Sequence, residues 1–518
     1  MSANMEKPTH TMSRKDLLDT TQDDLSTRKP KFHPSERYIE DRNAFTLPLV
    51  RYIGRTTSTL ALSFLFDWTQ VIRHPLGSVT ALVAYPLASS IMIAVSLGFR
   101  TFSHIDSGEL GKKLVSKMLA YEKVKQDLVD TAGDFLEDSF GLKHDQFTKM
   151  THYVDYSDPR YMRPSFNIDV AEFMLVLSAL MYEREEPSDG DYPSNDSELE
   201  RYTAFIRKQA REWGLEFKSL SELGTSASPF CGAFWDPHKK FIVIAFKGTT
   251  PTDFAEWAVD ATFMRTDGRT QLFGEVHEGF YRLLFGNEKK GRSKLIGNYP
   301  YRNILKNLHC IIEDIKGGDI NVWVTGHSLG SALASLFYAR LMRSPTDLPD
   351  NCILRDAYVF GTPCTGNDTF SVNFSSLCNT PSNRFNTCWR VIDDKDIVCR
   401  VPLGFDDPQI LQYASKNYIF DYAHIGEAIR LYQDGREPKT EVDELLLMKS
   451  KGHRAVDDFS GQEKGYGFLP AFVKDHLPYR YLKALQMARP YFPNNARTRG
   501  LHKGFGSFGG GSDAKKFI

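Results

Sequence analysis

The segment Asn321–Leu333 constrains the fold of this chain more than any other part of it. The β-branched residues Val322 and Val324 alternate as in a buried strand, and the sequence Gly-His-Ser-Leu-Gly follows at 326–330. Small and apolar residues then continue in a pattern suited to a helix. Strand, sharp turn and helix in this order predict an α/β fold in which the turn lies at the carboxyl end of a strand.

Ser328 lies at the centre of this turn. A serine hydroxyl is a weak nucleophile until a base takes its proton, and a sharp turn makes the hydroxyl project from the backbone. Gly326 and Gly330 lack a Cβ, so the strand and the helix can approach closely around the serine. The five-residue pattern alone is weak evidence in a chain with 37 glycines. The flanking strand and helix nevertheless favour Ser328 as a nucleophile.

Predicted strands and helices alternate around this segment. The apolar runs 241–246, 356–360 and 389–392 predict short strands, and two helices are predicted at 167–182 and 301–316. The first helix is apolar on most faces, so we expect it to be well buried. This alternation predicts an α/β sheet flanked by helices.

Composition excludes several classes of partner and cofactor. Lysine plus arginine (64) nearly balances aspartate plus glutamate (65), so we expect no nucleic-acid partner. The seven cysteines are odd in number and irregularly spaced between Cys231 and Cys399, which predicts neither a disulfide framework nor a zinc site. The sequence shows neither a glycine-rich phosphate loop nor a cluster of metal ligands, so we predict no metal and no organic cofactor. The polar, mixed-charge start of the sequence predicts neither a signal peptide nor a transit peptide.

A hydrophobic segment at residues 56–100 follows a polar stretch, residues 1–55, that we predict to be a disordered tail. Within it, Pro75–Phe99 contains no charged residue and no histidine. As a helix it would be roughly 37 Å long, enough to cross a bilayer core of about 30 Å. Pro86 near its middle allows a re-entrant hairpin instead, and a buried helix is the alternative to membrane association. The segment predicts an N-terminal, membrane-associated extension.

Basic residues around this segment indicate an orientation. Four of them lie within about 20 positions after Pro75–Phe99 and two lie within the same distance before it. This bias predicts a cytoplasmic C-terminal portion. We expect a helical connector at residues 101–165, a catalytic α/β domain at 166–487 and a flexible, glycine-rich tail at 488–518.

A serine nucleophile needs a histidine base and a carboxylate that orients the base. In hydrolases with this turn, both partners follow the serine in the chain. The acidic candidates are Asp393, Asp394 and Asp396, after a predicted strand. His453 lies in a charged segment and His502 in the loose tail. Spacing alone leaves two histidines, His424 and His476, as candidates for the base.

Backbone and hydroxyl donors must also stabilise the oxyanion that forms during ester hydrolysis. The strand at 241–246 runs into a sharp turn at which Thr249 can offer its N–H and its hydroxyl, and the N–H of Leu329 follows the nucleophile. The next segment carries large apolar side chains, among them Phe254, Trp257 and Phe263. Core packing would explain them, but a mobile lid that opens onto a lipid surface also fits their position.

Five short stretches in the same order resemble the class 3 lipases, the fungal triacylglycerol lipase family. They cover roughly residues 166–487 and are Phe246-Lys247-Gly248-Thr249-Thr250 with Trp257 and Asp260, Val276-His277-Glu278-Gly279-Phe280, Gly326-His327-Ser328-Leu329-Gly330, Phe360-Gly361-Thr362-Pro363 with Gly366-Asn367, and Asp396-Ile397-Val398-Cys399-Arg400-Val401-Pro402. The five together are far more specific than any one. The resemblance implies an α/β-hydrolase fold with a lid at about 250–264.

The resemblance also implies a choice among the candidates. Asp396 matches the acidic member of the family's triad, His476 matches its base, and His424 looks like a non-catalytic histidine. Thr249 matches the family's oxyanion position. Lys247 departs from the family, which usually has arginine there, and lysine cannot form the same bidentate ion pair. The hydrophobic segment is absent from the secreted fungal members, so their localisation and substrate do not carry over.

Together these features predict serine-dependent hydrolysis of ester bonds in acylglycerols by Ser328, His476 and Asp396. We expect the substrate to be a lipid at a membrane or lipid-droplet surface. The protein is expected inside the cell, at the endoplasmic reticulum or on lipid droplets. Three alternatives stay open: a phospholipase A1 or monoacylglycerol lipase, a catalytically silent lipase-like interaction protein, and a membrane-shaping protein led by residues 56–99.

Overall fold

The structure is a computed structural model. It describes residues 126–138, 166–185, 200–223, 230–248, 265–286, 300–315, 318–378, 386–396, 398–400, 402, 422–439 and 474–492. All of these belong to one compact unit, Tyr52–Ile518. The predicted polar tail, hydrophobic segment and lid lie outside the described residues. No helix in the described ranges is both long and apolar enough to cross a membrane.

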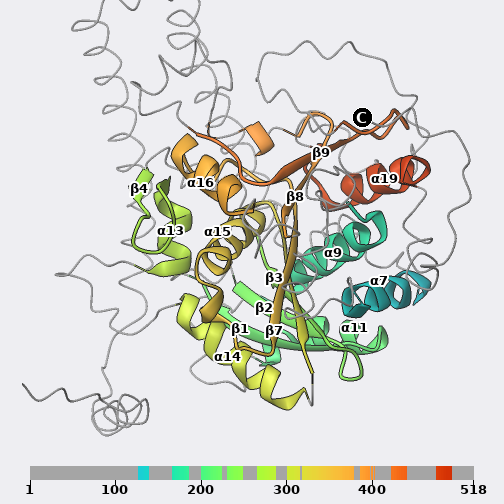
Figure 1. Ribbon diagram of the computed structural model, residues 1–518. Coiled ribbons are helices and arrows are strands. Elements are labelled where there is room, and N and C mark those ends of the chain that lie inside the picture. The colour runs from blue at the N-terminus through green and yellow to red at the C-terminus, as the bar shows by residue number, and fades with distance from the viewer. Residues whose placement is uncertain are drawn as a thin grey trace, which may run out of the picture. The chain divides into compact units, whose positions relative to one another are not determined.

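A seven-stranded sheet forms the centre of the molecule (Figure 1), with strands in the order β1-β2-β3-β6-β7-β8-β9. From β3 to β9 all neighbours are parallel, and β1 and β2 extend one edge as antiparallel strands. The strands are β1 (Glu216–Glu222), β2 (Phe230–Trp235), β3 (Phe241–Phe246), β6 (Ile320–His327), β7 (Cys352–Phe360), β8 (Cys388–Asp393) and β9 (Glu427–Leu431). The short strands β4 (Arg265–Asp267) and β5 (Glu275–His277) form a separate hairpin.

Helices cover both faces of the sheet (Figure 1). One face carries α7 (Gln126–Asp138), α9 (Ile168–Leu180), α11 (Ala204–Glu212) and α19 (Pro478–Ala488). The other carries α13 (Glu278–Phe285), α14 (Pro300–Asp314), α15 (Leu329–Arg343) and α16 (Asp368–Cys378). The described residues also contain short 3-10 helices: η3 (Met181–Glu183), η4 (Pro345–Asp347), η5 (Val398–Arg400) and η7 (Arg489–Tyr491). Helices on both faces of a mostly parallel sheet define the α/β class that the sequence predicts.

Strand β3 shows why its sequence is a continuous apolar run. Phe241, Val243 and Ala245 belong to one buried cluster, beneath α9. The intervening residues, among them Ile244 and Phe246, belong to the cluster on the opposite face. A strand covered on both faces needs apolar residues at every position, because successive side chains point to opposite sides.

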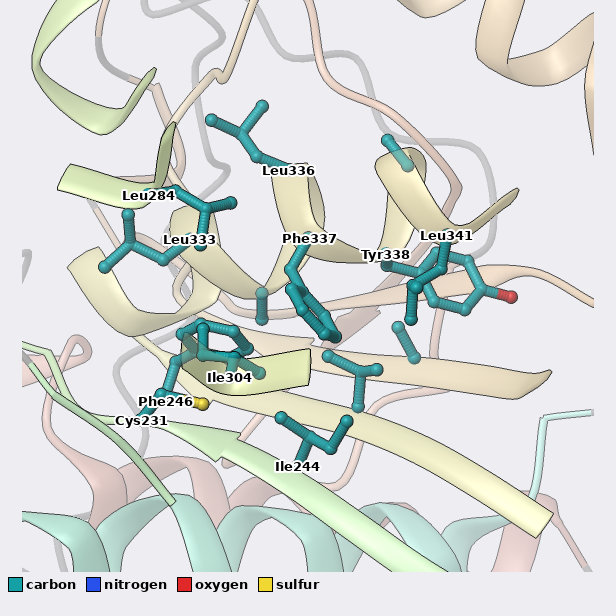
Figure 2. Packing of buried hydrophobic residues seen from close by; sticks show 14 of the residues in the cluster. Cys231, Ile244, Phe246, Leu284, Ile304, Leu333, Leu336, Phe337, Tyr338 and Leu341 are labelled. Carbon is teal, nitrogen blue, oxygen red and sulfur yellow. The ribbon is translucent and has the colours of Figure 1, made fainter. Parts of the chain in front are cut away.

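The cluster on the second face packs α15 against the sheet (Figure 2). Phe337 points from α15 toward the strands, and its ring centroid lies 5.3 Å from that of Phe246. Leu284 of α13 and Ile304 of α14 belong to the same buried cluster. This packing holds α15, and therefore the turn at its first residue, rigidly against β3 and β6.

Helix α9 fills the centre of the first face, as its apolar sequence predicts. The side chain of Asn167 caps its first turn by accepting hydrogen bonds from the N–H groups of Asp169 and Val170, at 3.0 and 3.2 Å. At its other end, η3 carries Tyr182 under the turn that follows β6. Helix α7 lies within the region predicted as a connector and packs into the same cluster through Val129.

A partly buried carboxyl, Asp356, joins the middle of β7 to β8. Its oxygens accept hydrogen bonds from the N–H of Thr387 at 3.0 Å and from the indole nitrogen of Trp389 at 2.8 Å. Burial raises the pKa of this carboxyl to about 7, although the two donors and nearby Arg355 act in the opposite direction. The protonation of Asp356 therefore changes near neutral pH.

The structure confirms the predicted strands and helices, with small changes at their ends. The strand predicted at 241–246 has these bounds, and β7 and β8 extend the predicted strands at 356–360 and 389–392. The helix predicted at 301–316 runs from Pro300 to Asp314. The described part of the chain continues to residue 492, a few positions beyond the predicted end of the catalytic domain.

Candidate active site

Ser328 lies on a strained turn between β6 and α15. Its φ of 59° makes it the one non-glycine residue with positive φ in the described part of the chain. Such a conformation costs of order 1–3 kcal/mol and persists only where the surrounding structure holds it. Gly330 shows how: a Cβ at this position would lie 2.8 Å from the nitrogen of Gly248, and closer still to the carbonyl oxygen of Phe246. The elbow therefore packs directly against the turn after β3.

Three predicted side chains meet at this elbow. The Oγ of Ser328 lies 2.8 Å from Nε2 of His476, and Nδ1 of His476 lies 2.9 Å from Oδ2 of Asp396. Because an ionised carboxylate can only accept, Nδ1 carries the imidazole proton and Nε2 is left to accept the proton of the serine. Serine, histidine and aspartate thus form one hydrogen-bonded chain in the orientation that proton transfer from Ser328 requires.

The carboxylate of Asp396 is fully buried and surrounded by donors. Oδ2 also accepts from the hydroxyl of Tyr481 at 2.5 Å, and Oδ1 accepts from the N–H of Val398 at 2.8 Å. The thiol of Cys399 lies 3.6 Å from Oδ2. Burial by itself raises the pKa of Asp396, but His476, Tyr481 and Val398 together outweigh burial and lower it. Asp396 is therefore ionised at neutral pH.

A second histidine, His327, supports the base from behind. Its Nε2 lies 2.8 Å from the carbonyl oxygen of His476 and its Nδ1 lies 2.8 Å from the hydroxyl of Tyr182. A carbonyl can only accept, so Nε2 donates and Nδ1 accepts from Tyr182. Burial lowers the pKa of His327 to about 3, and the ring stays neutral. The elbow thereby holds the backbone of the residue that supplies the base.

Gly361, immediately after β7, makes room for the histidine and the carboxylate. It has a φ of +61°, and a Cβ there would lie 2.8 Å from Cε1 of His476 and 3.1 Å from Oδ2 of Asp396. Only a residue without a side chain allows the pair to approach the end of this strand. In the sequence, Gly361 stands out only as part of the Phe-Gly-Thr-Pro stretch, and that stretch does not predict its role beside the triad.

The remaining acidic and histidine candidates lie elsewhere. Asp394 is partly buried and pairs with Arg436 at 3.8 Å. His424 is buried, and its Nε2 donates to the carbonyl oxygen of Cys399 at 2.8 Å. His453 and His502 lie outside the described residues, as do Thr249, Phe254, Trp257 and Phe263. Leu329 is the first residue of α15, and the first amide of a helix has no acceptor within the helix.

Asp393 forms a pair with Asp475, the residue before His476. Gln433 bridges them, with its amide nitrogen 2.5 Å from Asp393 and 3.5 Å from Asp475, and Arg480 lies 3.1 Å from Asp475. Burial, and then the neighbouring carboxylate Asp475, raises the pKa of Asp393 well above its usual value. Burial also raises the pKa of Asp475, to about 6, against the effect of Arg480. Asp393 thus supports the segment that holds His476 and does not contact the imidazole.

Tyr182, His327 and Tyr481 were missed as site residues because nothing local marks them. His327 stands inside the Gly-x-Ser-x-Gly pattern, but its partners come from residues 182 and 476. Lys247, noted as a departure from arginine, is fully buried, and its ammonium lies 6.0 Å from the ring centroid of Tyr182. These residues are distant in sequence from one another, so only the folded chain reveals their contacts.

One stretch of the chain matches a known protein family. Residues 243–405 match the family model described as lipase (class 3). The chain carries a class 3 lipase domain. Within the part of this lipase domain that the structure describes, no three His, Cys, Asp or Glu side chains are grouped so as to hold a metal ion.

Relatives of the lipase domain include two named enzymes of Arabidopsis thaliana. Triacylglycerol lipase OBL1 is 28% identical over 239 residues, which are 41% of this chain and 41% of that protein. Phospholipase A1-IIgamma is 26% identical over 149 residues, 27% of this chain and 34% of that protein. Among solved structures, a Rhizomucor miehei lipase propeptide complex is similar with a TM-score of 0.36 and 20% identity, over 51% of this chain and 67% of that one. The chain therefore spans less than half the length of these two curated relatives.

Proposed function

We propose that this protein is a serine hydrolase that cleaves the ester bonds of acylglycerols, in the manner of a triacylglycerol lipase. The observation that carries the proposal is the hydrogen-bonded chain from Ser328 through His476 to Asp396 on a strained elbow. The class 3 lipase domain supports it, as does the relative named as a triacylglycerol lipase.

In the proposed reaction, Ser328 Oγ attacks the carbonyl carbon of the ester while Nε2 of His476 takes the hydroxyl proton. A bond forms between Oγ and carbon, and the carbonyl electrons move to oxygen. The tetrahedral intermediate then expels the alcohol, which takes the proton back from His476. Water hydrolyses the acyl-enzyme by the same steps, with His476 again as the base. Asp396 holds the imidazole in the required tautomer and stabilises its charged form.

The developing oxyanion needs donors that are in place before the reaction. We assign this role to the N–H of Leu329, at the start of α15, and to the N–H and hydroxyl of Thr249. Support for Thr249 comes from the preceding residue, because Gly248 packs against the elbow and brings the turn after β3 next to Ser328. Phe254, Trp257 and Phe263 are assigned to a lid over the site on the basis of their sequence position.

We further propose that residues 56–100 bring the lipase domain to a lipid surface inside the cell. The support is Pro75–Phe99, which has no charged residue and no histidine and is long enough to cross the bilayer core or to enter it as a hairpin. The endoplasmic reticulum or a lipid droplet is the proposed location, with the catalytic domain on the cytoplasmic side. Carbonate extraction of cell membranes tests this membrane association. The full-length protein should stay with the membranes, and a control variant that lacks residues 75–99 should be released. Release of the full-length protein by carbonate would contradict the proposal.

A phospholipid is the second candidate substrate, because a relative is named as a phospholipase A1. Monoacylglycerol is a third. The chemistry at Ser328 is the same for all three, since each presents a carboxylic ester to the nucleophile. The triad therefore does not indicate which of the three substrates is preferred, and an activity assay has to decide.

The decisive experiment measures hydrolysis by the full-length protein and by Ser328→Ala. The substrates are a short-chain ester, a triacylglycerol emulsion, a monoacylglycerol and phosphatidylcholine vesicles. Ser335→Ala is the matched control, because Ser335 is a buried serine about two turns further along the same helix. Losing its bond to the Ser331 carbonyl, 2.8 Å away, should leave the rate within a few fold.

We expect the wild-type protein to hydrolyse at least one substrate, and Ser328→Ala to lose several orders of magnitude in kcat. His476→Ala should lose nearly as much, and the losses should not add in the double variant. The preferred substrate then separates triacylglycerol lipase from phospholipase. If wild type is no faster than Ser328→Ala on every substrate, the catalytic proposal fails, and a lipase-like interaction protein becomes the better explanation.

A further inference from the structure

Tyr481 donates to the same carboxylate oxygen that pairs with the base. Its hydroxyl lies 2.5 Å from Oδ2 of Asp396, and Nδ1 of His476 lies 2.9 Å from that atom. Burial raises the pKa of the phenol well above its usual value, so the hydroxyl keeps its proton and acts as the donor. The contact joins helix α19 to the segment after β8, which is 85 residues away in sequence.

The position of Tyr481 in the fold couples it to the base. His476 lies two residues before α19, and Tyr481 lies in the first turn of that helix. The ring of Tyr481 is fully buried, with the ring of Phe360 edge-on at a centroid distance of 6.2 Å. Helix α19 and the residues just before it therefore supply both the base and a second donor to the carboxylate that orients the base.

We propose that Tyr481 is a positioning residue of the triad: its hydroxyl fixes the carboxylate of Asp396 and moderates how strongly that carboxylate attracts a proton onto His476. This role deepens the proposed function and rests on it. With Val398 on Oδ1 and His476 and Tyr481 on Oδ2, the carboxylate is held from both ends and cannot rotate. A free carboxylate would let the imidazole turn away from Ser328.

The sign of the electrostatic effect follows from the direction of the O–H dipole. Its positive end points at Asp396 and offsets part of the negative charge that stabilises an imidazolium. Removing the hydroxyl therefore favours the protonated base, and the acid limb of kcat/KM moves to higher pH. At the same time the loosened carboxylate lowers kcat. A residue that served only to fill space would lower the rate without moving the limb.

Other titratable groups near the triad must be unchanged between the proteins that are compared. They come from four parts of the chain: Asp393 and Asp394 at the end of β8, Cys399 and Arg400 in η5, Asp475 and Arg480 beside His476, and His327 in the elbow. Burial raises the pKa of Asp475 to about 6, and burial and the neighbouring Asp475 raise that of Asp393 well above its usual value, so this pair is a competing source of an acid limb. The measurement is therefore made both with Asp475 and in an Asp475→Asn background.

The experiment compares pH profiles of kcat and KM for Tyr481→Phe and wild type on a soluble short-chain ester. We expect kcat to fall roughly tenfold with KM unchanged, and the acid limb of kcat/KM to rise by about half a pH unit, in both backgrounds. Tyr358→Phe is the matched control, because Tyr358 is also fully buried but its hydroxyl contacts the N–H of Asn167, at 3.3 Å. Its acid limb should stay where wild type has it.

A second variant covers the case in which Tyr481→Phe fails to fold. Replacing Tyr481 with 3-fluorotyrosine keeps the shape of the ring and makes the hydroxyl a stronger donor, so the acid limb should move to lower pH. If the acid limb of kcat/KM lies at the wild-type pH in Tyr481→Phe or in the fluorinated protein, the proposed role of Tyr481 is overturned. The proposal of ester hydrolysis is unaffected by that result. If wild type hydrolyses no ester, the proposed function fails and this role fails with it.

Discussion

Replacing Gly330 with alanine tests whether the elbow positions the turn after β3. The added Cβ would lie 2.8 Å from both the nitrogen of Gly248 and the carbonyl carbon of Lys247, where ordinary contact begins at 3.4 Å. The difference, 3.4 minus 2.8, requires the turn to retreat by about 0.6 Å at these atoms and by more at the carbonyl oxygen of Phe246. All three neighbours are backbone atoms, so no side-chain rotation can relieve the clash.

This displacement predicts a loss of activity larger than the loss of stability. The turn leads directly into Thr249, the proposed oxyanion donor, and a misplacement of about 1 Å can cost about 10²-fold in rate. We therefore expect kcat on a soluble ester to fall roughly 10- to 100-fold. Overpacking should also lower the free energy of unfolding by roughly 1–3 kcal/mol, so kcat is measured well below the unfolding temperature of the variant.

Gly133→Ala provides the control for the Gly330 experiment. Gly133 is a buried glycine in α7, but a Cβ there would meet only side-chain atoms, the nearest being the Nζ of Lys239 at 3.2 Å. A flexible lysine can move away, so this variant should keep wild-type kcat. If Gly330→Ala remains folded with the kcat of wild type, the turn after β3 does not supply the oxyanion donors, and the reasoning is refuted.

Asp356→Asn should change how the free energy of unfolding depends on pH. In the folded wild type the pKa of this carboxyl is raised to about 7. The carboxyl therefore stabilises the fold fully below about pH 4, and this contribution is lost as the pH rises through 7. Urea unfolding at pH 5 and pH 8 measures this: the free energy of unfolding of the variant relative to wild type should be roughly 2–4 kcal/mol higher at pH 8 than at pH 5. The same difference between variant and wild type at both pH values would contradict the prediction. Tyr182→Phe leaves Nδ1 of His327 without its donor, which should cost about 1–3 kcal/mol in unfolding free energy and several fold in kcat; an unchanged kcat would show that His327 needs no donor. Arg489→Gln breaks the ion pairs with Asp169 and Glu172. The arginine is 40% exposed, which weakens both pairs, but Glu172 is left buried without its cation. We therefore expect the free energy of unfolding to fall by roughly 1–3 kcal/mol with kcat unchanged, and a large loss of activity would contradict this.

Three strands of the main sheet were not predicted from the sequence: β2, which lies one position in from the edge, and the two edge strands β1 and β9. The outermost strands, Glu216–Glu222 and Glu427–Leu431, contain charged residues among the apolar ones. An edge strand is only partly covered, so it needs no continuous apolar run and its pattern is weak. The central strand Phe241–Phe246 is buried on both faces, and for that reason its sequence alone predicted it.

The choice of base illustrates the same division for the site. From spacing, His424 and His476 were equal candidates, and only the resemblance to class 3 lipases favoured His476. In the folded chain His476 lies beside Ser328 across 148 residues of sequence, whereas His424 lies against the carbonyl of Cys399. Sequence spacing carries no information about a contact that is made only by packing α19 beside the end of β8.

The elbow around Ser328 could be predicted from sequence, because a strand, a turn with two glycines and a helix are encoded by neighbouring residues. Tertiary structure decided what surrounds the elbow: the tyrosine beneath His327, the glycine beside His476 and the tyrosine that holds Asp396. These contacts join segments that lie far apart in the chain, and burial strengthens the two hydrogen bonds among them, because a hydrogen bond is electrostatically stronger where water is excluded.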